Sequence, residues 1–198
     1  MLVTGIKSKP VSTTLKPDPS GLYHLLVGQG SGGEALLRLL RAMPAGAEVH
    51  VLYATEPFSG KDWSEQLGES WSDLRVFPTQ AEIVSKLDGT LSRCITGTRL
   101  YIAGSESFIG SAVQIAMTHH LNSDELQCEH CGSTARRVYC IHCRTLNEKV
   151  TTNIATCTGC SRHLLVGNHY SGRLGAYMGV MVDAEAPGEL PSIEEVFV

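Results

Sequence analysis

The chain has 198 residues and a net charge of −4 at pH 7, with 42% hydrophobic and 18% charged residues. This acidic balance argues against a nucleic-acid partner, because neutralising phosphates requires a basic surface. No segment approaches the roughly 18 apolar residues of a membrane span, and the N-terminus lacks the apolar core of a signal peptide. We therefore expect a cytoplasmic protein that binds neither nucleic acid nor membrane, with one main core and one small satellite module.

Strand and helix patterns alternate along the chain after an N-terminal arm. Residues 1–20 contain three prolines and predict an extended arm that can add an edge strand. A buried parallel strand is expected from the apolar run LYHLLV, and further strands are expected from EVHVLYATEP, LRVF and RLYIAG. Helices are expected from EALLRLLRAM, a short segment between the two tryptophans, TQAEIVSKL with its capping-box pair Thr79 and Glu82, and SFIGSAVQIAMTHHL. The alternation predicts an α/β domain with a parallel sheet over residues 1–122.

Six of the seven cysteines form three CxxC pairs between Cys128 and Cys160, and Cys94 is expected to be a buried, unpaired thiol. In a reducing compartment the paired pattern favours metal-bound thiolates over disulfides. The second and third pairs, in YCIHC and CTGC, are separated by thirteen residues, which is the spacing of a zinc ribbon. Each CxxC turn directs two thiolates to one point, and a hairpin between the turns closes a tetrahedral site. We therefore predict that one zinc or iron ion is bound by Cys140, Cys143, Cys157 and Cys160.

The first CxxC pair leaves an alternative open. Cys128 and Cys131 are followed by a spacer of only eight residues before the next pair, which is short for a two-stranded hairpin. A site that uses this pair in place of one of the others is the alternative assignment. An iron–sulfur cluster is also chemically possible, since four thiolates are what such a cluster needs. His130, His142 and His163 lie within or next to the pairs, but four cysteines make a histidine ligand unnecessary.

The C-terminal region, residues 123–198, is expected to form a small β module that follows the polar linker NSDELQ. It has too few apolar residues for an independent core, so a metal must substitute for one. Within it, HYSGRLGAYMG, from His169 to Gly179, predicts a partner-binding segment, because tyrosine and arginine are favoured in interfaces. The apolar residues of the terminal PSIEEVFV suggest docking against another surface.

A glycine-rich turn, GQGSGG, lies between the first predicted strand and the first predicted helix. Gly28, Gly30 and Gly33 form a GxGxxG pattern, which in this context can hold a phosphate against backbone N–H groups. Glu56 lies near the position where a dinucleotide site places an acid for the ribose. Glu34 brings negative charge to the helix start, which opposes phosphate binding. The sequence therefore leaves two interpretations open, a cofactor-binding loop and a structural turn.

The segments LLVGQGSGGEALLRLLRAM and LYIAGSESFIGSAV resemble the nicotinamide-nucleotide half of ferredoxin reductases. The resemblance implies a ferredoxin-reductase-like domain in which a glycine-rich loop and a later cysteine-containing turn surround the cofactor. Ala103 stands where that turn usually has cysteine, and no flavin-binding barrel precedes the domain. We therefore expect that the chain does not carry out this redox chemistry alone.

The run from Tyr139 to Glu189, which begins YCIHCRTLNEKV, is similar to the small subunit of bacterial dimethylamine monooxygenase. The resemblance implies an NADPH-dependent, multicomponent enzyme that oxidatively N-demethylates dimethylamine. It also implies two partners, a haem-containing oxygenase subunit and a reductase subunit with flavin and an iron–sulfur cluster. The chain would then act in assembly or electron relay, without catalytic residues of its own.

Two other functions stay open at this point: a stand-alone nucleotide-dependent reductase and a zinc-ribbon adaptor. The absent turn cysteine and flavin domain disfavour the reductase, and the acidic charge disfavours an adaptor for nucleic acid. No Ser–His–Asp pattern and no open three-ligand metal site indicates independent catalysis.

Overall fold

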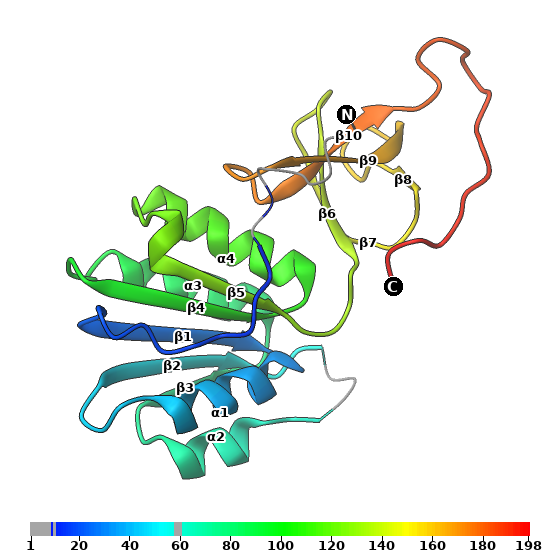
Figure 1. The fold of residues 1–198 in the computed structure, drawn as a ribbon. Helices are drawn as coiled ribbons and strands as arrows, with labels where there is room; N and C mark the ends of the chain where they lie inside the picture. The colour runs from blue at the N-terminus through cyan, green and yellow to red at the C-terminus, as the bar shows by residue number, and fades with distance from the viewer. Residues whose placement is uncertain (1–8, 10, 58–60) are drawn as a thin grey trace, which may run out of the picture.

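The structure is a computed structural model that describes residue 9 and residues 11–57 and 61–198 (Figure 1). Its first part is a five-stranded parallel sheet, called sheet A here, with strand order β3-β2-β1-β4-β5. The strands are β1 (Tyr23–Gln29), β2 (Glu48–Ala54), β3 (Leu74–Phe77), β4 (Thr98–Gly104) and β5 (Leu126–His130). The helices are α1 (Gly32–Ala42), α2 (Ser64–Ser70), α3 (Gln80–Leu91) and α4 (Glu106–Thr118). The predicted parallel α/β domain is confirmed.

Helices cover both faces of sheet A, with α1 and α2 on one face and α3 and α4 on the other (Figure 1). Successive residues of β1 therefore point into different cores, Leu25 into the one under α3 and α4, and Leu26 into the one under α1 and α2. Burial on both faces explains why the central strands β1 and β4 appear in the sequence as nearly continuous apolar runs. Half of the predicted capping box is present, since the Thr79 side chain accepts a hydrogen bond from Glu82 N at 3.3 Å at the start of α3, while the Glu82 carboxylate accepts from the Thr79 hydroxyl at 2.9 Å.

Sheet A continues past the domain boundary predicted at residue 122. Residues 122–127, which we predicted to be a polar linker, contain the short 3₁₀ helix η1 (Ser123–Glu125) and enter β5, which pairs with β4. β5 lies at the edge of the sheet, and Cys128 is its only buried residue, so the strand lacks a long apolar signature. The N-terminal arm adds a bridge at this edge, as predicted, where Thr13 N donates to Cys128 O at 2.8 Å.

The second part of the chain forms another five-stranded sheet, called sheet B here, with order β7-β6-β10-β9-β8. Its strands are β6 (Arg136–Cys140), β7 (Leu146–Val150), β8 (Ile154–Thr156), β9 (His163–Ser171) and β10 (Ala176–Met181). All neighbours are antiparallel except β6 and β10, which are parallel. The C-terminal segment docks on this sheet, as its apolar residues suggested: Phe197 N donates to Thr151 O at 2.8 Å, and the Arg136 guanidinium lies 3.8 Å from the centre of the Phe197 ring.

The β9–β10 hairpin packs against α4 and joins the two sheets. Tyr170 and Tyr177 are 4% and 1% exposed, and the Tyr177 hydroxyl donates to the Glu106 carboxylate at the start of α4. The backbones of Gly110 and Gly175 come so close that a Cβ on either would collide with the carbonyl of the other. The prediction of a partner-binding segment here assumed bare tyrosines, and that premise is wrong because they pack within the chain.

No helix within the described residues has both the length and the apolar character that crossing a membrane requires.

Candidate metal centre

The second CxxC pair of the sequence, Cys140 and Cys143, forms the first knuckle of the site, which leaves the end of β6 and folds back into β7. Cys140 N donates to Thr145 O at 2.9 Å, and Arg144 N donates to Cys140 O at 2.9 Å. Arg144 has a φ of 66°, the left-handed conformation that lets the chain turn away directly after the second cysteine. These bonds make a compact knuckle that presents both thiols on the same side.

The third CxxC pair, Cys157 and Cys160, forms the second knuckle and repeats this pattern between β8 and β9. Cys157 N donates to Arg162 O at 2.9 Å, and Ser161 N donates to Cys157 O at 2.9 Å. Ser161 has a φ of 58°, at the position that Arg144 holds in the first turn. The two knuckles are therefore equivalent, and the hairpins on either side bring them face to face.

The sulfur atoms of the two knuckles converge on one point. All four Sγ atoms lie within 4.8 Å of one another, and this is the one such group of metal-ligating side chains in the part of the chain described. Sγ–Sγ distances across the knuckles are 3.5 Å for Cys143 and Cys157 and 3.8 Å for Cys140 and Cys160. A tetrahedral ion with metal–sulfur bonds of about 2.3 Å requires sulfur–sulfur distances of about 3.8 Å. The predicted ligands fit one tetrahedral ion, and their separation is too long for a disulfide.

The four thiols differ in their electrostatic surroundings. Hydrogen bonds with Thr145 lower the pKa of Cys143 to about 6, and a hydrogen bond from the Arg162 backbone lowers the pKa of Cys160. Burial instead raises the pKa of Cys140 to about 11. Metals bind the thiolate form of cysteine. Hydrogen bonds therefore favour the metal-binding form of Cys143 and Cys160, the second cysteine of each knuckle, whereas burial disfavours the thiolate of Cys140.

Asn147 in β7 connects the two knuckles and was not identified from the sequence. Its side chain is 4% exposed, and its Nδ2 donates to Val138 O at 3.2 Å and lies 3.8 Å from Cys157 Sγ. Its Oδ1 accepts from both the backbone N, at 2.8 Å, and the hydroxyl, at 3.0 Å, of Thr158 in the second knuckle. The buried amide therefore holds the second knuckle against the strand that follows the first. The available signal was a polar residue beside Leu146 in a short strand between two CxxC pairs.

The chain matches known proteins over both of its parts. Residues 4–126 match the family described as dimethylamine monooxygenase subunit DmmA-like, N-terminal domain, and residues 137–180 match the corresponding C-terminal domain. The chain belongs to this DmmA-like family. A curated relative, the heme-dependent oxidative N-demethylase delta subunit of Ectopseudomonas mendocina (strain ymp), is 31% identical over 169 residues, which make up 85% of each chain.

Solved structures with a related arrangement include an intact type IV self-sufficient cytochrome P450 monooxygenase, with 21% identity and a TM-score of 0.48. Another is the ferredoxin reductase of carbazole 1,9a-dioxygenase in its FAD apo form, with 16% identity and a TM-score of 0.47. The matched regions cover 62% and 59% of this chain, but only 17% and 35% of those two longer chains.

In this DmmA-like chain the first CxxC pair lies outside the metal centre. Cys128 in β5 faces the core under α4, and burial raises its pKa to about 12. Cys131 packs on the opposite core, under α1. The alternative ligand sets that include this pair are therefore not formed. The adjacent histidines make other contacts, since His142 Nε2 accepts from Met181 N at 3.3 Å and His163 hydrogen-bonds with a threonine hydroxyl.

The glycine-rich turn packs tightly against the rest of the chain. A Cβ at Gly28 would collide with Leu36, and one at Gly33 would collide with Trp63. Gly30 has a φ of 51°, which favours glycine, and its carbonyl accepts a hydrogen bond from a buried tyrosine hydroxyl at 2.9 Å. These contacts account for the three glycines as parts of a structural turn, and a cofactor-binding role for them stays a prediction.

Polar side chains of the chain itself bridge the carboxyl ends of the central strands, where α/β folds usually bind ligands. Gln29, at the end of β1, accepts from the Ser105 hydroxyl at 2.8 Å and donates to the Gln80 side chain at 3.0 Å. Glu56 accepts from Gln80 N at 2.8 Å and pairs with Lys149 of β7 at 2.9 Å. Glu56, the acid that a dinucleotide site would use for the ribose, is thus ion-paired with β7 of the four-cysteine module.

Proposed function

We propose that the chain is a subunit of an oxidative N-demethylase that acts on dimethylamine, and that it has no catalytic residues of its own. The observation that carries the proposal is the 31% identity to an N-demethylase delta subunit over 85% of both chains. The family description, a dimethylamine monooxygenase subunit, supports the same substrate. The partners in this proposal are a haem-containing oxygenase subunit and a reductase subunit with flavin and an iron–sulfur cluster.

The four-cysteine site supports a role for this subunit that depends on a bound ion, either zinc or iron. Zinc has no redox chemistry and would hold the module in shape for assembly, whereas iron bound by the same thiolates would supply a one-electron couple for relay between reductase and oxygenase. The chain's own residues act in the same way in both cases. The knuckles fix four sulfur positions, and Asn147 holds the knuckles together.

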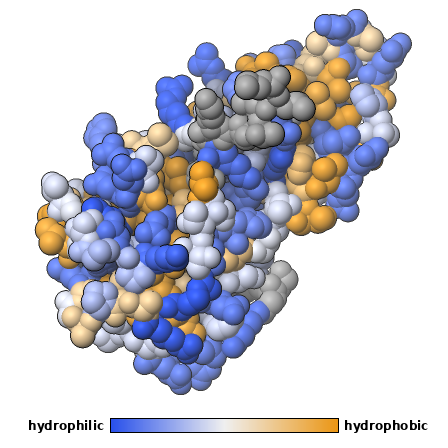
Figure 2. Space-filling model, in the orientation of Figure 1, coloured by the Kyte–Doolittle hydropathy of each residue, from blue (hydrophilic) through white to orange (hydrophobic). Residues whose placement is uncertain are grey.

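The outer face of sheet B supports the binding of a partner subunit. Leu165 and Val180 are neighbours on β9 and β10 and are 42% and 40% exposed, and Ile141 in the first knuckle is 45% exposed. Figure 2 shows hydrophobic residues gathered on the part of the surface that the module forms. Contiguous exposed apolar residues with a polar surround are typical of protein interfaces. We propose that the oxygenase or the reductase subunit covers this face.

Reconstitution of the enzyme tests the proposal. The oxygenase and reductase subunits are assayed with dimethylamine, NADPH and O₂, with and without the chain, and formaldehyde release is measured. We expect demethylation to require the chain, and a full rate without it would contradict the subunit role. The chain alone should not oxidise NADPH, and turnover by the isolated chain would instead support the stand-alone reductase.

A pair of substitutions tests the proposed docking face. Leu165→Glu places a charge on this face, whereas Val76→Glu places one on exposed β3, where the side chain is 45% exposed. We expect Leu165→Glu to abolish co-elution with the partner subunits while metal content is kept, and Val76→Glu to co-elute normally. Normal co-elution of Leu165→Glu would show that the partners bind elsewhere.

A further inference from the structure

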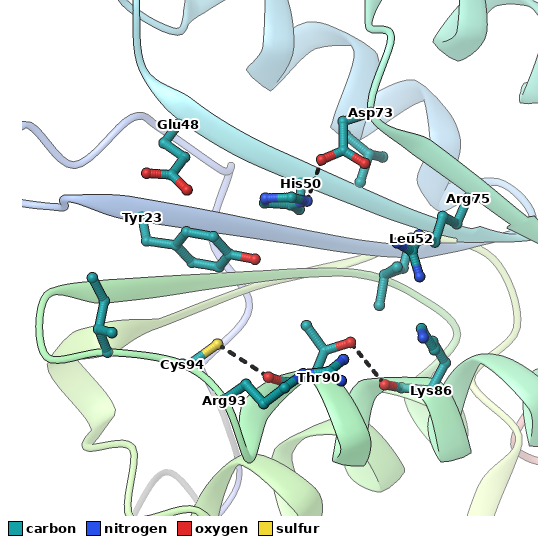
Figure 3. Close-up of a pocket in the computed structure, with 12 residues that line it drawn as sticks. Tyr23, Glu48, His50, Leu52, Asp73, Arg75, Lys86, Thr90, Arg93 and Cys94 are labelled. Carbon is teal, nitrogen blue, oxygen red and sulfur yellow. Dashed lines mark hydrogen bonds and ion pairs between the residues drawn. The ribbon is translucent and has the colours of Figure 1, made fainter.

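A pocket of about 270 Å³ opens on the α3 side of sheet A, at the amino ends of β1, β2 and β3 (Figure 3). Its wall is formed by the start of β1, residues 48–52 of β2, the start of β3, and the last turns of α3 with the segment that follows. The metal centre and the glycine-rich turn lie beyond the carboxyl ends of the strands, so this pocket is separate from both. Neither the family match nor the relative's description assigns a role to it.

Three cations line the pocket without an anionic partner. Arg75 comes from β3, Lys86 from α3 and Arg93 from the segment after α3, and Figure 3 shows them grouped on one side. None of the three side chains forms an ion pair or hydrogen bond with any residue described. Three unpaired cations around one cavity, in a chain of net charge −4, attract an anion.

The acidic groups at the pocket do not cancel this charge. Asp73 pairs with His50 on its own side of the pocket, and Glu48 lies at the other end from the three cations (Figure 3). Burial raises the pKa of Tyr23 to about 12, so its hydroxyl is a neutral hydrogen-bond donor at physiological pH. The lining therefore offers cationic groups on one side and a neutral donor facing them.

The three cations are not needed as hydrogen-bond donors to the free carbonyls at the C-terminus of α3. Lysine and arginine often bind the free carbonyls at a helix C-terminus. Here the Lys86 carbonyl accepts from the Thr90 hydroxyl at 2.9 Å, and the Thr90 carbonyl accepts from the Cys94 thiol at 3.5 Å, as the dashed lines in Figure 3 show. Ser92 satisfies two further carbonyls of the same turn. The guanidinium and ammonium groups are therefore available to a ligand.

We propose that this pocket binds a small organic anion, whose phosphate or carboxylate group is held by Arg75, Lys86 and Arg93. The apolar part of the ligand packs against the ring of Tyr23 and the side chain of Leu52, which is 3% exposed on the pocket floor. The volume is just below the 300 Å³ or so at which drug-sized sites begin, so the ligand is limited to a single ring or a short chain.

Binding of three probes to the full-length chain tests this proposal. Phenyl phosphate and benzoate share an apolar ring and differ in the anionic group, and inorganic phosphate has no apolar part. Titration calorimetry at constant ionic strength should show saturable binding of one probe molecule per chain for at least one ring-bearing anion, tighter than for inorganic phosphate. The tighter of the two ring-bearing anions identifies the preferred group, and no saturable binding of either would overturn the proposal.

Substitutions locate the binding. Arg75→Gln and Arg93→Gln each remove one charge-assisted contact from an exposed side chain, so the fold should be kept and affinity should fall by about ten-fold. Arg41→Gln, in the exposed last turn of α1, is the matched control and should bind as the unsubstituted chain does. Equal affinity in all three variants would overturn the assignment to this pocket.

A second readout uses the thiol in the pocket wall. Cys94 is half-buried there, and Cys131, also half-buried, lies in the core region under α1. A saturating ring-bearing anion should slow maleimide labelling of Cys94, followed by peptide mass spectrometry, and leave Cys131 labelling unchanged. Unchanged labelling of Cys94 at saturation would place the anion elsewhere and contradict the proposal.

Discussion

The two sheets of this chain are stabilised by different means. Sheet A has two cores, one on each face, supplied by four helices and by strands that are apolar on both sides. Among the described residues, the hydrophobic cluster within sheet B has six buried members, and two of these are the cysteines Cys140 and Cys157. A core of this size offsets little of the entropy of ordering five strands, so we predict that an ion bound by the four cysteines contributes to the stability of the module. The difference between the sheets predicts a domain held by apolar burial beside a module that depends on coordination.

Metal removal should separate the two regions most strongly. Structural zinc sites contribute on the order of 10 kcal/mol of folding free energy, and the sheet B cluster is small. After treatment with a chelator, we expect amide hydrogen exchange to become fast in β6 to β10 and to stay slow in β1 to β4. Equal loss of protection in both sheets would contradict the division into two differently stabilised parts.

Two cysteine substitutions should act on opposite regions. Cys157→Ser leaves three thiolates, so we expect partial loss of metal and protease cleavage within the module. Cys128→Ser buries a hydroxyl in the core of sheet A and should lower that domain's unfolding free energy by about 1–3 kcal/mol, with metal content unchanged. Elemental analysis and limited proteolysis measure both effects. Retained metal in Cys157→Ser with loss in Cys128→Ser would place the ion on the first CxxC pair.

Asn147→Ala should weaken the module without removing a ligand. The substitution leaves the Thr158 backbone N and the Val138 carbonyl without their buried partner, a cost of about 1–3 kcal/mol. Substitution of a residue that holds metal ligands in place typically lowers metal affinity about 10–100-fold, which competition with a chromophoric chelator measures. Asn168→Ala, on the exposed part of β9, is the control and should leave affinity unchanged. Equal affinities would show that Asn147 does not support the site.

Gly110→Ala should weaken the contact between α4 and the β9–β10 hairpin, and we expect it to change the stability of the two regions least. The added Cβ collides with the Gly175 carbonyl, and such overpacking costs about 1–3 kcal/mol. We expect the module to unfold at lower temperature, while the α/β domain changes little. Gly89→Ala in α3, where a Cβ meets nothing within 4 Å, is the control and should stabilise its helix by about 0.5–1 kcal/mol. A single unshifted transition in Gly110→Ala would show that α4 does not anchor the module.

The sequence was sufficient to predict the elements whose signal is local. The buried central strands, the amphipathic helices and Thr79 as the N-cap of α3 depend on neighbouring residues, and all were found. The edge strand β5 was missed because one buried residue, Cys128, is all that distinguishes it from a linker. Tyr170 and Tyr177 were misinterpreted because their partner, α4, is more than fifty residues away in the sequence. A surface that another part of the chain covers cannot be told from an interface by composition alone.

The convergence of the four predicted ligands was predictable because a CxxC turn fixes its own geometry and a hairpin spacer requires a minimum length. Proximity in the sequence could not exclude Cys128 and Cys131. The structure does so because β5 belongs to sheet A and directs these residues into its cores. Asn147 and the cationic pocket were not predictable, since each depends on side chains from elements that only the tertiary fold brings together.

The metal content of the full chain decides whether the four cysteines form one metal site. The chain is purified anaerobically, and zinc and iron are measured per chain together with the visible spectrum. We predict about one ion per chain, colourless if it is zinc and coloured if it is ferric iron bound by four thiolates. Two ions per chain, or none, would contradict the single four-cysteine site on which the module's stability and its proposed role depend.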